Sequence, residues 1–251
     1  MPAETVLILT PVKNAAGHLD AYFRGLERLT YPAESLSLGL LESDSGDGTF
    51  ERLGRHLERA APRLRAASLF RRDFGFTLPP GVPRYAHEVQ VQRRAVLARA
   101  RNHLLFRALD DEAWVLWLDV DVVEYPPDVI ERLLATGKDI VTPHCVCDYG
   151  GRSFDTNAWR DHGRRHLHDL RGEGPLVPLD AVGGTMLLVR ADVHRDGVVF
   201  PPFPYGRPNP RIRADNHWVG EIETEGLGIM AGDAGVQCWG MPHLEIRHAR
   251  H

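Results

Sequence analysis

The stretch WVLWLDVDVVEYPPD, residues 114–128, decides how this chain can fold. It opens with five apolar residues in a row, Trp114–Leu118, a run typical of a strand buried on both faces of a parallel sheet. Asp119 and Asp121 follow directly, and in open α/β sheets ligands bind just outside the carboxyl ends of the strands. Mg²⁺ typically takes one or two carboxylates together with substrate phosphates. The stretch therefore predicts a metal–nucleotide site, with two aspartates that merely cap a turn as the alternative.

Strands and helices alternate on both sides of this stretch. Apolar runs at 6–9 and 36–41 predict two strands, each followed by a polar loop and a helix with one apolar face. The first helix should cover 15–29, and the second should begin near Thr49. The remaining expected elements are strands at 67–70, 139–142, 182–190, 236–239 and 244–246, and helices at 87–109, 126–137 and 223–233. This rhythm predicts an α/β fold with a mostly parallel central sheet flanked by helices, in a single domain over residues 1–251.

Composition narrows the classes of partner. The 251 residues include 30 basic and 34 acidic side chains, for a net charge of -4, which argues against nucleic acid or an anionic membrane as the main partner. No apolar run approaches the ~18 residues of a membrane span, and the N-terminus MPAETVLILTP lacks the basic region of a signal peptide. These features predict a cytoplasmic protein. Peripheral attachment to a membrane, a chain trimmed of an anchor, and a homo-oligomer are left open.

Further carboxylates lie at expected strand ends and loop tips, namely Glu42, Asp44, Glu223 and Glu225. In a parallel sheet such ends share one edge with Asp119 and Asp121. The helix at 87–109 carries Arg99 and Arg101, which could balance a diphosphate. A metal ion there would act as a Lewis acid and neutralise the charge on a departing diphosphate. The combination predicts group transfer from a nucleotide-activated donor.

The sequence also resembles known enzymes. Four segments resemble GT-A glycosyltransferases: VLILTPVKNA (6–15), ESDSGDGT (42–49), ARARN (98–102) and WVLWLDVDVVEYPP (114–127). Three others are similar to the fungal mannan-polymerase mannosyltransferases, glycosyltransferase family 62: FDTNAW (154–159), PLDAVGGTMLLVRADVHRDGVVFPPFPY (178–205) and EIETEGLGIMAGDAGVQCWGMP (221–242). The likeness covers nearly the whole chain. It departs in two ways, since fungal members carry an N-terminal membrane anchor and stem that are absent here, and residues 206–220 look like an insertion.

The resemblance implies a GT-A fold, a GDP-mannose donor, Mn²⁺ or Mg²⁺, and retaining α-mannosyl transfer to a mannoside or other glycan acceptor. Asp119 and Asp121 match the Asp-x-Asp motif of these enzymes. Asp121 is expected to ligate the metal, and Asp119 to contact the ribose or the metal. A late histidine often completes such a site, and His248 is the first candidate and His243 the second. A surface or packing role for either histidine is the alternative.

The same resemblance assigns residues to the nucleotide. Those expected to hold guanosine are Thr10, Pro11, Val12, Asn14, Glu42 and Asp44, with ordinary turn and N-cap chemistry as the alternative. Arg101 matches a position that touches the donor in related enzymes. Arg93 and Arg94 fit better as the solvated face of a basic helix.

Other residues are expected around the sugar. Residues 145–178 lack clear periodicity, but Phe154 and Trp159 indicate an ordered functional flap. Within it, Asp155 and Asn157 should line the sugar pocket together with Trp159, for which a core position is the alternative. Gly183 and Gly184 would let the backbone approach the donor sugar or the acceptor, or would form a bulge.

Glu223 and Glu225 are the acidic pair expected near the acceptor, and with Asp121 they form the predicted catalytic set. One of the pair would orient the attacking hydroxyl or stabilise an oxocarbenium-like transition state. A carboxylate nucleophile and front-face attack, in which the departing phosphate takes the proton, both remain open without distances. Charge that complements a helix N-terminus would explain one of the glutamates without catalysis.

Two other functions are compatible with such a fold. A nucleotidyltransferase that makes a sugar nucleotide would usually have a Gly-rich, basic loop after the first strand, and residues 10–18 hold only Lys13 and one glycine. A non-catalytic nucleotide-sugar-binding protein would not need Asp119, Asp121 and Glu225 together. We therefore expect a metal-dependent retaining mannosyltransferase.

Overall fold

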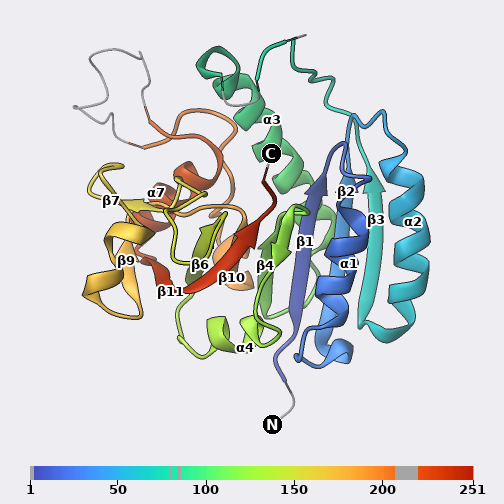
Figure 1. Ribbon diagram of the computed structural model, residues 1–251, viewed down its shortest axis with the longest axis horizontal. Coiled ribbons are helices and arrows are strands. Elements are labelled where there is room, and N and C mark those ends of the chain that lie inside the picture. Colours follow the sequence, from blue (N-terminus) through green and yellow to red (C-terminus); the bar gives the residue numbers. More distant parts are fainter. Residues whose placement is uncertain (1–2, 80, 84–85, 207–219, 251) are drawn as a thin grey trace.

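The computed structural model describes residues 3–79, 81–83, 86–206 and 220–250. Within these ranges nine strands form one sheet in the order β3-β2-β1-β4-β10-β6-β11-β5, with β9 paired to β11 (Figure 1). The strands of this sheet are β1 (Val6–Val12), β2 (Leu36–Glu42), β3 (Ala66–Arg71), β4 (Trp114–Leu118), β5 (Val122–Glu124), β6 (Ile140–Val146), β9 (Val177–Leu179), β10 (Met186–Arg190) and β11 (Cys238–His248). Most of the insertion expected at 206–220 lies outside the described residues.

Six of these nine strands run the same way. β1 pairs in parallel with β2 and β4, and β2 pairs in parallel with β3. β10 is antiparallel to both of its neighbours, β4 and β6, so β6 runs in the direction of β4. β11 then pairs in parallel with β6. The prediction of a mostly parallel α/β sheet is confirmed.

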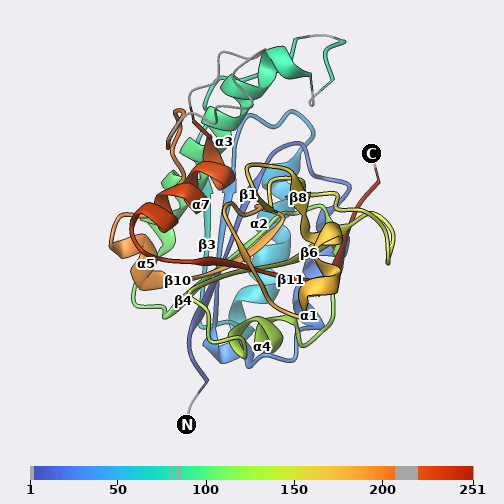
Figure 2. The same cartoon turned by 90° about the vertical axis from the view of Figure 1, so that its left-hand side faces the viewer.

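Helices cover both faces of the sheet, which explains why its central strands are apolar throughout. Along β1, Val6 and Ile8 belong to the core shared with α1 (Leu19–Glu27), α2 (Thr49–Ala60) and α4 (Val129–Leu134). Leu7 and Leu9 belong to the core shared with α3 (His87–Ala108), α5 (Ala191–Arg195) and α7 (Glu223–Asp233). Figure 2 shows α3, α5 and α7 together on one side of the sheet. None of the described helices combines the length and apolar content that a bilayer crossing requires.

A short strand that the sequence pattern did not reveal shapes the carboxyl edge. β5 lies directly after Asp121 and pairs antiparallel with the end of β11, where Val122 is opposite His248. β11 is one strand, although two were expected, at 236–239 and 244–246. Its register shifts between Met241 and Glu245, around Pro242, whose nitrogen cannot donate a ladder hydrogen bond.

Two expected elements are shorter in the structure. The helix expected at 126–137 is α4, Val129–Leu134. The strand expected at 182–190 begins only at Met186. The preceding residues turn toward the flap, where the amide and hydroxyl of Thr185 donate to Asp155 Oδ2 at 3.2 and 3.1 Å. The 145–178 segment itself contains a small hairpin, β7 (Trp159–Arg160) with β8 (Arg165–His166).

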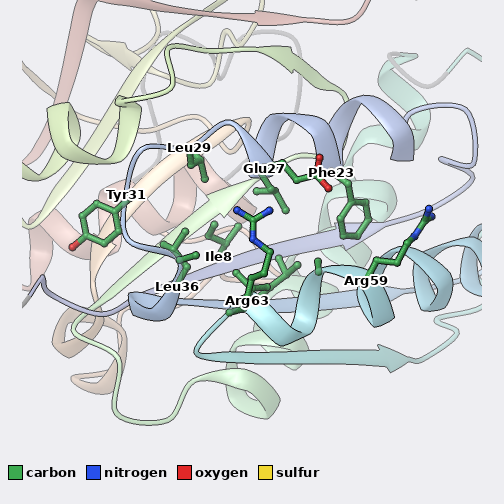
Figure 3. Close-up of a pocket in the computed structure, with 13 residues that line it drawn as sticks. Ile8, Phe23, Glu27, Leu29, Tyr31, Leu36, Arg59 and Arg63 are labelled. Carbon is green, nitrogen blue, oxygen red and sulfur yellow. The ribbon is translucent and has the colours of Figure 1, made fainter.

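A small cavity of about 70 Å³ lies between α1, β2 and α2 (Figure 3). Ile8, Phe23, Leu29 and Leu36 contribute to its lining, with Arg59 and Arg63 among the polar residues. None of the strand-end acids lines it. Because its lining is mostly apolar, we interpret it as a feature of core packing.

His194 on α5 should make the stability of the fold depend on pH. It is 4% exposed, its Nδ1 donates to the Val198 carbonyl oxygen, and its Nε2 accepts from Trp117 Nε1 at 3.2 Å. Burial lowers its pKa from 6.5 to about 4, so only the unfolded chain binds a proton between these values. The contribution of His194 to the free energy of unfolding should therefore decrease as the pH falls, by about 2 kcal/mol from roughly pH 7.5 to roughly pH 5.

Urea unfolding at the two pH values measures this effect. His194→Gln should be less stable than the wild type at neutral pH, and the difference between the two proteins should shrink by about 2 kcal/mol at the lower pH, because the variant lacks the contribution of His194. Burial also lowers the pKa of His144 to about 4, so some dependence should persist in that variant. A pH dependence that His194→Gln leaves unchanged would show that other groups cause it.

Candidate active site

The predicted metal ligands meet at the carboxyl edge of the sheet. Asp119 follows β4, Asp121 lies in the turn between β4 and β5, and His248 is the last residue of β11. The pairing of β5 with β11 brings Asp121 Oδ1 to 3.0 Å from His248 Nε2. The Ala249 amide also donates to the Asp121 carbonyl oxygen at 2.9 Å, so backbone and side chain hold the two segments together.

The ring of His248 is held in one orientation. It is 3% exposed, and it stacks on Phe154 with ring centroids 3.9 Å apart. Its Nδ1 donates to the Ala249 carbonyl oxygen at 2.7 Å. When the ring is neutral and its proton is on Nδ1, the lone pair of Nε2 faces the Asp121 carboxylate. This arrangement is favourable only when a proton or a cation lies between Nε2 and the carboxylate. Burial lowers the pKa of His248, but the hydrogen bond and charge of Asp121 outweigh burial and raise it overall.

Asp121 and His248 fit a divalent cation. A metal-bound histidine usually donates its other ring N–H to a carbonyl or carboxylate, as His248 does to Ala249. An octahedral ion holds its ligands at about 2.1 Å, so two neighbouring ligands at right angles lie about 3 Å apart. Asp121 Oδ1 and His248 Nε2 are 3.0 Å apart, which matches this spacing. No group of three or more His, Cys, Asp or Glu side chains able to hold a metal occurs in the described ranges. The protein would thus supply few ligands, and a diphosphate would supply others.

The second histidine candidate lies apart from these acids. The exposed His243 is in contact with the Arg171 carbonyl oxygen, 3.0 Å from its Nε2. Of the two candidates, the structure therefore brings only His248 to Asp121.

A pocket of about 560 Å³ opens beside Asp121. Its volume falls in the range of roughly 300–1,000 Å³ that is typical of small-molecule sites. The residues expected at the nucleotide that line it are Pro11, Val12, Asn14 and Asp44. Asn14 Oδ1 accepts from the Gly46 amide at 2.9 Å, which ties the loop after β1 to the loop after β2. The pocket therefore lies where the loops of adjacent parallel strands meet.

Thr10 and Glu42 correct the expected set of guanosine contacts. Thr10 is fully buried, and its hydroxyl bonds to the hydroxyl of Tyr22 and the carbonyl oxygen of Leu118 at 2.6 and 2.7 Å. Glu42 is also fully buried and lies 3.2 Å from Arg71. Both side chains stabilise the strand ends from inside and do not face the pocket.

Asp44 lines the pocket, but its carboxylate has a structural role. It accepts hydrogen bonds from the amides of Phe74 and Gly75, both at 3.0 Å. It also lies 3.9 Å from the ammonium group of Lys13. Asp44 therefore shapes the loop that follows β3, as the alternative of ordinary turn chemistry anticipated.

Arg101 differs most from its expected place. It is 1% exposed, its Nη2 donates to Asp119 Oδ1 at 3.0 Å, and its Nε donates to Glu223 Oε1 at 2.8 Å. The expected contact with the donor is corrected, because the guanidinium binds two protein carboxylates. Desolvation raises the pKa of Asp119 to about 6, and Asp121 and Glu223 add to the shift against the opposing effect of Arg101.

The two glycines are required by protein packing. A Cβ on Gly183 would come within 2.1 Å of Asp155 Oδ2, and one on Gly184 within 2.6 Å of Arg101 Nη2. The glycine pair therefore makes room for these two side chains, and its expected approach to a sugar or the acceptor stays a prediction. Asp155 Oδ1 accepts from the Asn157 amide, and Asn157 Nδ2 lies 3.4 Å from Thr224 Oγ1. The flap is thereby joined to the start of α7.

Glu223 and Glu225 both lie in the first turn of α7, but in different surroundings. Glu223 is 3% exposed and bound to Arg101. Glu225 Oε2 pairs with Arg94 Nη2 at 2.6 Å, and its Oε1 accepts from Trp159 Nε1 at 2.6 Å. Arg94 is therefore largely buried by its partners and not part of a solvated helix face.

Several residues that face the site were not assigned to it from the sequence, among them Arg93, which was expected on a solvated helix face. Lys13, His18 and Arg93 line the pocket, as do residues 76–78 of the loop after β3. Arg93, Val96, Leu97 and Ala100 line it from α3, and their i, i+3, i+4, i+7 spacing is a signal that could have shown this face. Burial, with a contribution from Glu225, also raises the pKa of Glu221 to about 7, a value suited to proton transfer.

Comparisons with known proteins match this architecture. The model of the Anp1 family matches residues 2–170 and 162–204. The anp1 subunit of the mannan polymerase II complex of Schizosaccharomyces pombe is 32% identical over 289 residues, covering 98% of this chain and 64% of its own length. The MNN9 subunit of the mannan polymerase complex of Candida albicans is 30% identical over 291 residues, covering 98% of this chain and 74% of its own. The chain thus spans a little under two thirds of the first of these relatives.

Solved structures agree on the fold. A mannosyltransferase from Pyrobaculum calidifontis, determined in complex with GDP-Man and Mn²⁺, superposes with a TM-score of 0.59 at 17% sequence identity. The match covers 97% of this chain and 56% of that one. The predicted GT-A fold and the resemblance to the fungal mannan polymerase subunits are confirmed.

Proposed function

Because this chain belongs to the Anp1 family, we propose that it is a metal-dependent glycosyltransferase that transfers mannose from GDP-mannose to a glycan acceptor with retention of configuration. The observation that carries the proposal is the Asp121–His248 pair, 3.0 Å apart beside a pocket of about 560 Å³. The relatives support it, since they are named as mannan polymerase subunits, and a protein of the same fold was determined with GDP-Man and Mn²⁺.

In this proposal the pocket holds the nucleotide. Pro11 and Val12 at the end of β1, with Asn14 in the loop that follows, would enclose the nucleoside, since all three line the pocket. Lys13 and Arg93 are the lysine and arginine that line the pocket, and we assign them to the diphosphate. Arg93 replaces Arg101 in this role, because the Arg101 guanidinium is bound to Asp119 and Glu223.

Asp121 and His248 would hold Mn²⁺ or Mg²⁺, with Asp119 beside them. The bound ion would neutralise the charge that develops on the departing diphosphate. Phe154 and Ala249 keep the imidazole of His248 in the orientation that turns Nε2 to the site. On the acceptor side, Arg94 and Trp159 fix the Glu225 carboxylate, which we assign to the attacking hydroxyl.

Thermal unfolding with a panel of nucleotides tests the proposal. GDP together with Mn²⁺ should raise the melting temperature by several degrees, because a ligand at 100 times its Kd stabilises a protein by about 2.7 kcal/mol. GDP with a chelator should have little effect, since the diphosphate and the cation complete each other's site. Stabilisation by CTP or UTP, or by GDP without metal, would contradict the proposal and favour a nucleotidyltransferase or a simple binder.

A further inference from the structure

Two arginines of α3 reach the beginning of α7. Arg94 and Arg101 are seven residues apart, about two helical turns, and so lie on the same face of α3. Arg101 binds Glu223 at 2.8 Å and Asp119 at 3.0 Å through different nitrogens. Arg94 binds Glu225 at 2.6 Å. Two links therefore hold the first turn of α7 against α3, and one of them continues to the acid at the end of β4.

Glu223 has a backbone conformation that depends on such support. Its φ is 63°, in the left-handed region that side chains other than Gly, Asn and Asp seldom adopt. Strain of this kind persists only where the surroundings over-determine it, and it clusters at functional sites. The carboxylate of Glu223 is fixed by Arg101 Nε and by the hydroxyl of Thr224 at 3.1 Å.

The guanidinium of Arg101 is tightly enclosed. The rings of Trp117 and Phe200 each lie 5.4 Å from its Cζ, and the Gly184 carbonyl oxygen accepts from Nη2 at 3.3 Å. A side chain at position 184 would collide with it. The site therefore suits the planar fork of an arginine, which stacks on rings and binds two carboxylates at fixed angles, better than the point charge of a lysine.

We propose that Arg101 is a positioning residue that couples the donor side of the active site to the acceptor side. By binding Asp119 and Glu223 at once, it sets the orientation of the Asp119 carboxylate and, through the first turn of α7, the place of Glu225. Arg94 binds Glu225 and the Ile222 carbonyl oxygen, both at the start of α7, and so serves only the acceptor side. The inference rests on the proposed function, which defines the donor side and the acceptor side. The link from Asp119 through Arg101 to Glu223 is a property of the metal-free protein.

Arg101→Lys tests the coupling, because an ammonium group keeps the charge but not the fork. With Mn²⁺, calorimetry should show GDP affinity weakened about 10- to 100-fold, the range for residues that orient metal ligands, and kcat should fall by a similar factor. Arg94→Lys should lower kcat and leave GDP affinity at the wild-type level. Arg65→Lys is the matched control, since Arg65 is likewise shared by two carboxylates, Asp111 and Glu112, outside the site. GDP affinity and kcat should both stay at the wild-type level in Arg65→Lys.

A second measurement needs neither metal nor nucleotide. Hydrogen exchange at the amides of the first turn of α7 should be faster in metal-free Arg101→Lys than in the wild type, and unchanged in Arg65→Lys. If Arg101→Lys does not fold, Glu223→Gln takes its place, because it keeps the side-chain length and removes the charge that Arg101 Nε binds. The same acceleration is expected in Glu223→Gln.

A double-mutant cycle decides whether Arg101 acts through Asp119. Asp119→Asn combined with Arg101→Lys should bind GDP little worse than Asp119→Asn alone, because both substitutions affect one carboxylate. The positioning role would be overturned if the α7 amides of Arg101→Lys exchanged at the wild-type rate. It would also be overturned if the losses of GDP affinity in Arg101→Lys and Asp119→Asn simply added in the double variant. A wild-type protein that binds no GDP with Mn²⁺ would instead contradict the proposed function, and the exchange measurement would still decide the link.

Discussion

Asp121→Ala is expected to abolish mannosyl transfer and Mn²⁺-dependent GDP binding together. Asp121 lines the pocket, and its Oδ1 lies 3.0 Å from His248 Nε2. Its removal takes away the anionic member of the pair and leaves a buried imidazole as a weak site for a hard cation. Residues that only orient metal ligands contribute about 10- to 100-fold, so loss of a ligand should weaken GDP binding by more than about 100-fold.

Calorimetry with GDP, with and without Mn²⁺, measures the binding, and release of GDP from GDP-mannose measures the reaction. Asp128→Ala is a suitable control, since Asp128 forms an exposed ion pair with Arg132 four residues on. It should bind GDP and react as the wild type does. The melting temperature of metal-free Asp121→Ala should fall by only a few degrees, because the side-chain contact with His248 is lost while the apolar core and the Ala249–Asp121 backbone hydrogen bond remain. Retained Mn²⁺-dependent GDP binding in Asp121→Ala would show that the metal site lies elsewhere.

Glu225→Gln is expected to leave GDP binding intact and to lower kcat by about 100-fold. The carboxylate lies in the first turn of α7, held by Arg94 and Trp159, and Glu225 is not among the residues that line the pocket proposed for the nucleotide. A glutamine has nearly the same shape and can still accept from Trp159 Nε1, but it has no charge to offer an attacking hydroxyl or a positive transition state. A positioned acid or base typically contributes 10²–10⁴-fold to a rate, which sets the scale of the loss.

Glu173→Gln provides the matched control for this substitution. Glu173 also joins two positively charged partners, Arg160 and Arg165, but on the surface of the flap. Its variant should keep the wild-type kcat. A normal kcat in Glu225→Gln would move the acceptor-side role to Glu223 or Glu221. Loss of GDP binding in that variant would instead mean that the start of α7 had collapsed onto the pocket.

Local patterns were sufficient for most of the fold. The apolar run Trp114–Leu118 and the acids that follow it predicted a buried strand with a ligand edge, and β4 is a fully buried strand in the middle of the sheet, between β1 and β10. A strand that is buried on both faces appears as a continuous apolar run, and a helix that is buried on one face appears as a short apolar repeat, so the sequence records both directly. β5, with three residues, was too short to leave such a repeat. The resemblance to fungal mannan polymerase subunits rested on contiguous motifs for the same reason.

The choice among polar residues was made by contacts between distant segments. Nothing near His248 or His243 in the sequence distinguishes them, and the pairing of β5 with β11 is what brings His248 to Asp121. Arg101 and Arg93 lie on one helix, yet the first is enclosed by Asp119 and Glu223 while the second lines the pocket. The chain alone therefore predicted an acidic strand end as a metal site and indicated the family, which the comparisons confirmed. The role of each charged side chain was decided only in three dimensions, because burial and hydrogen-bond partners depend on which strands and helices become neighbours.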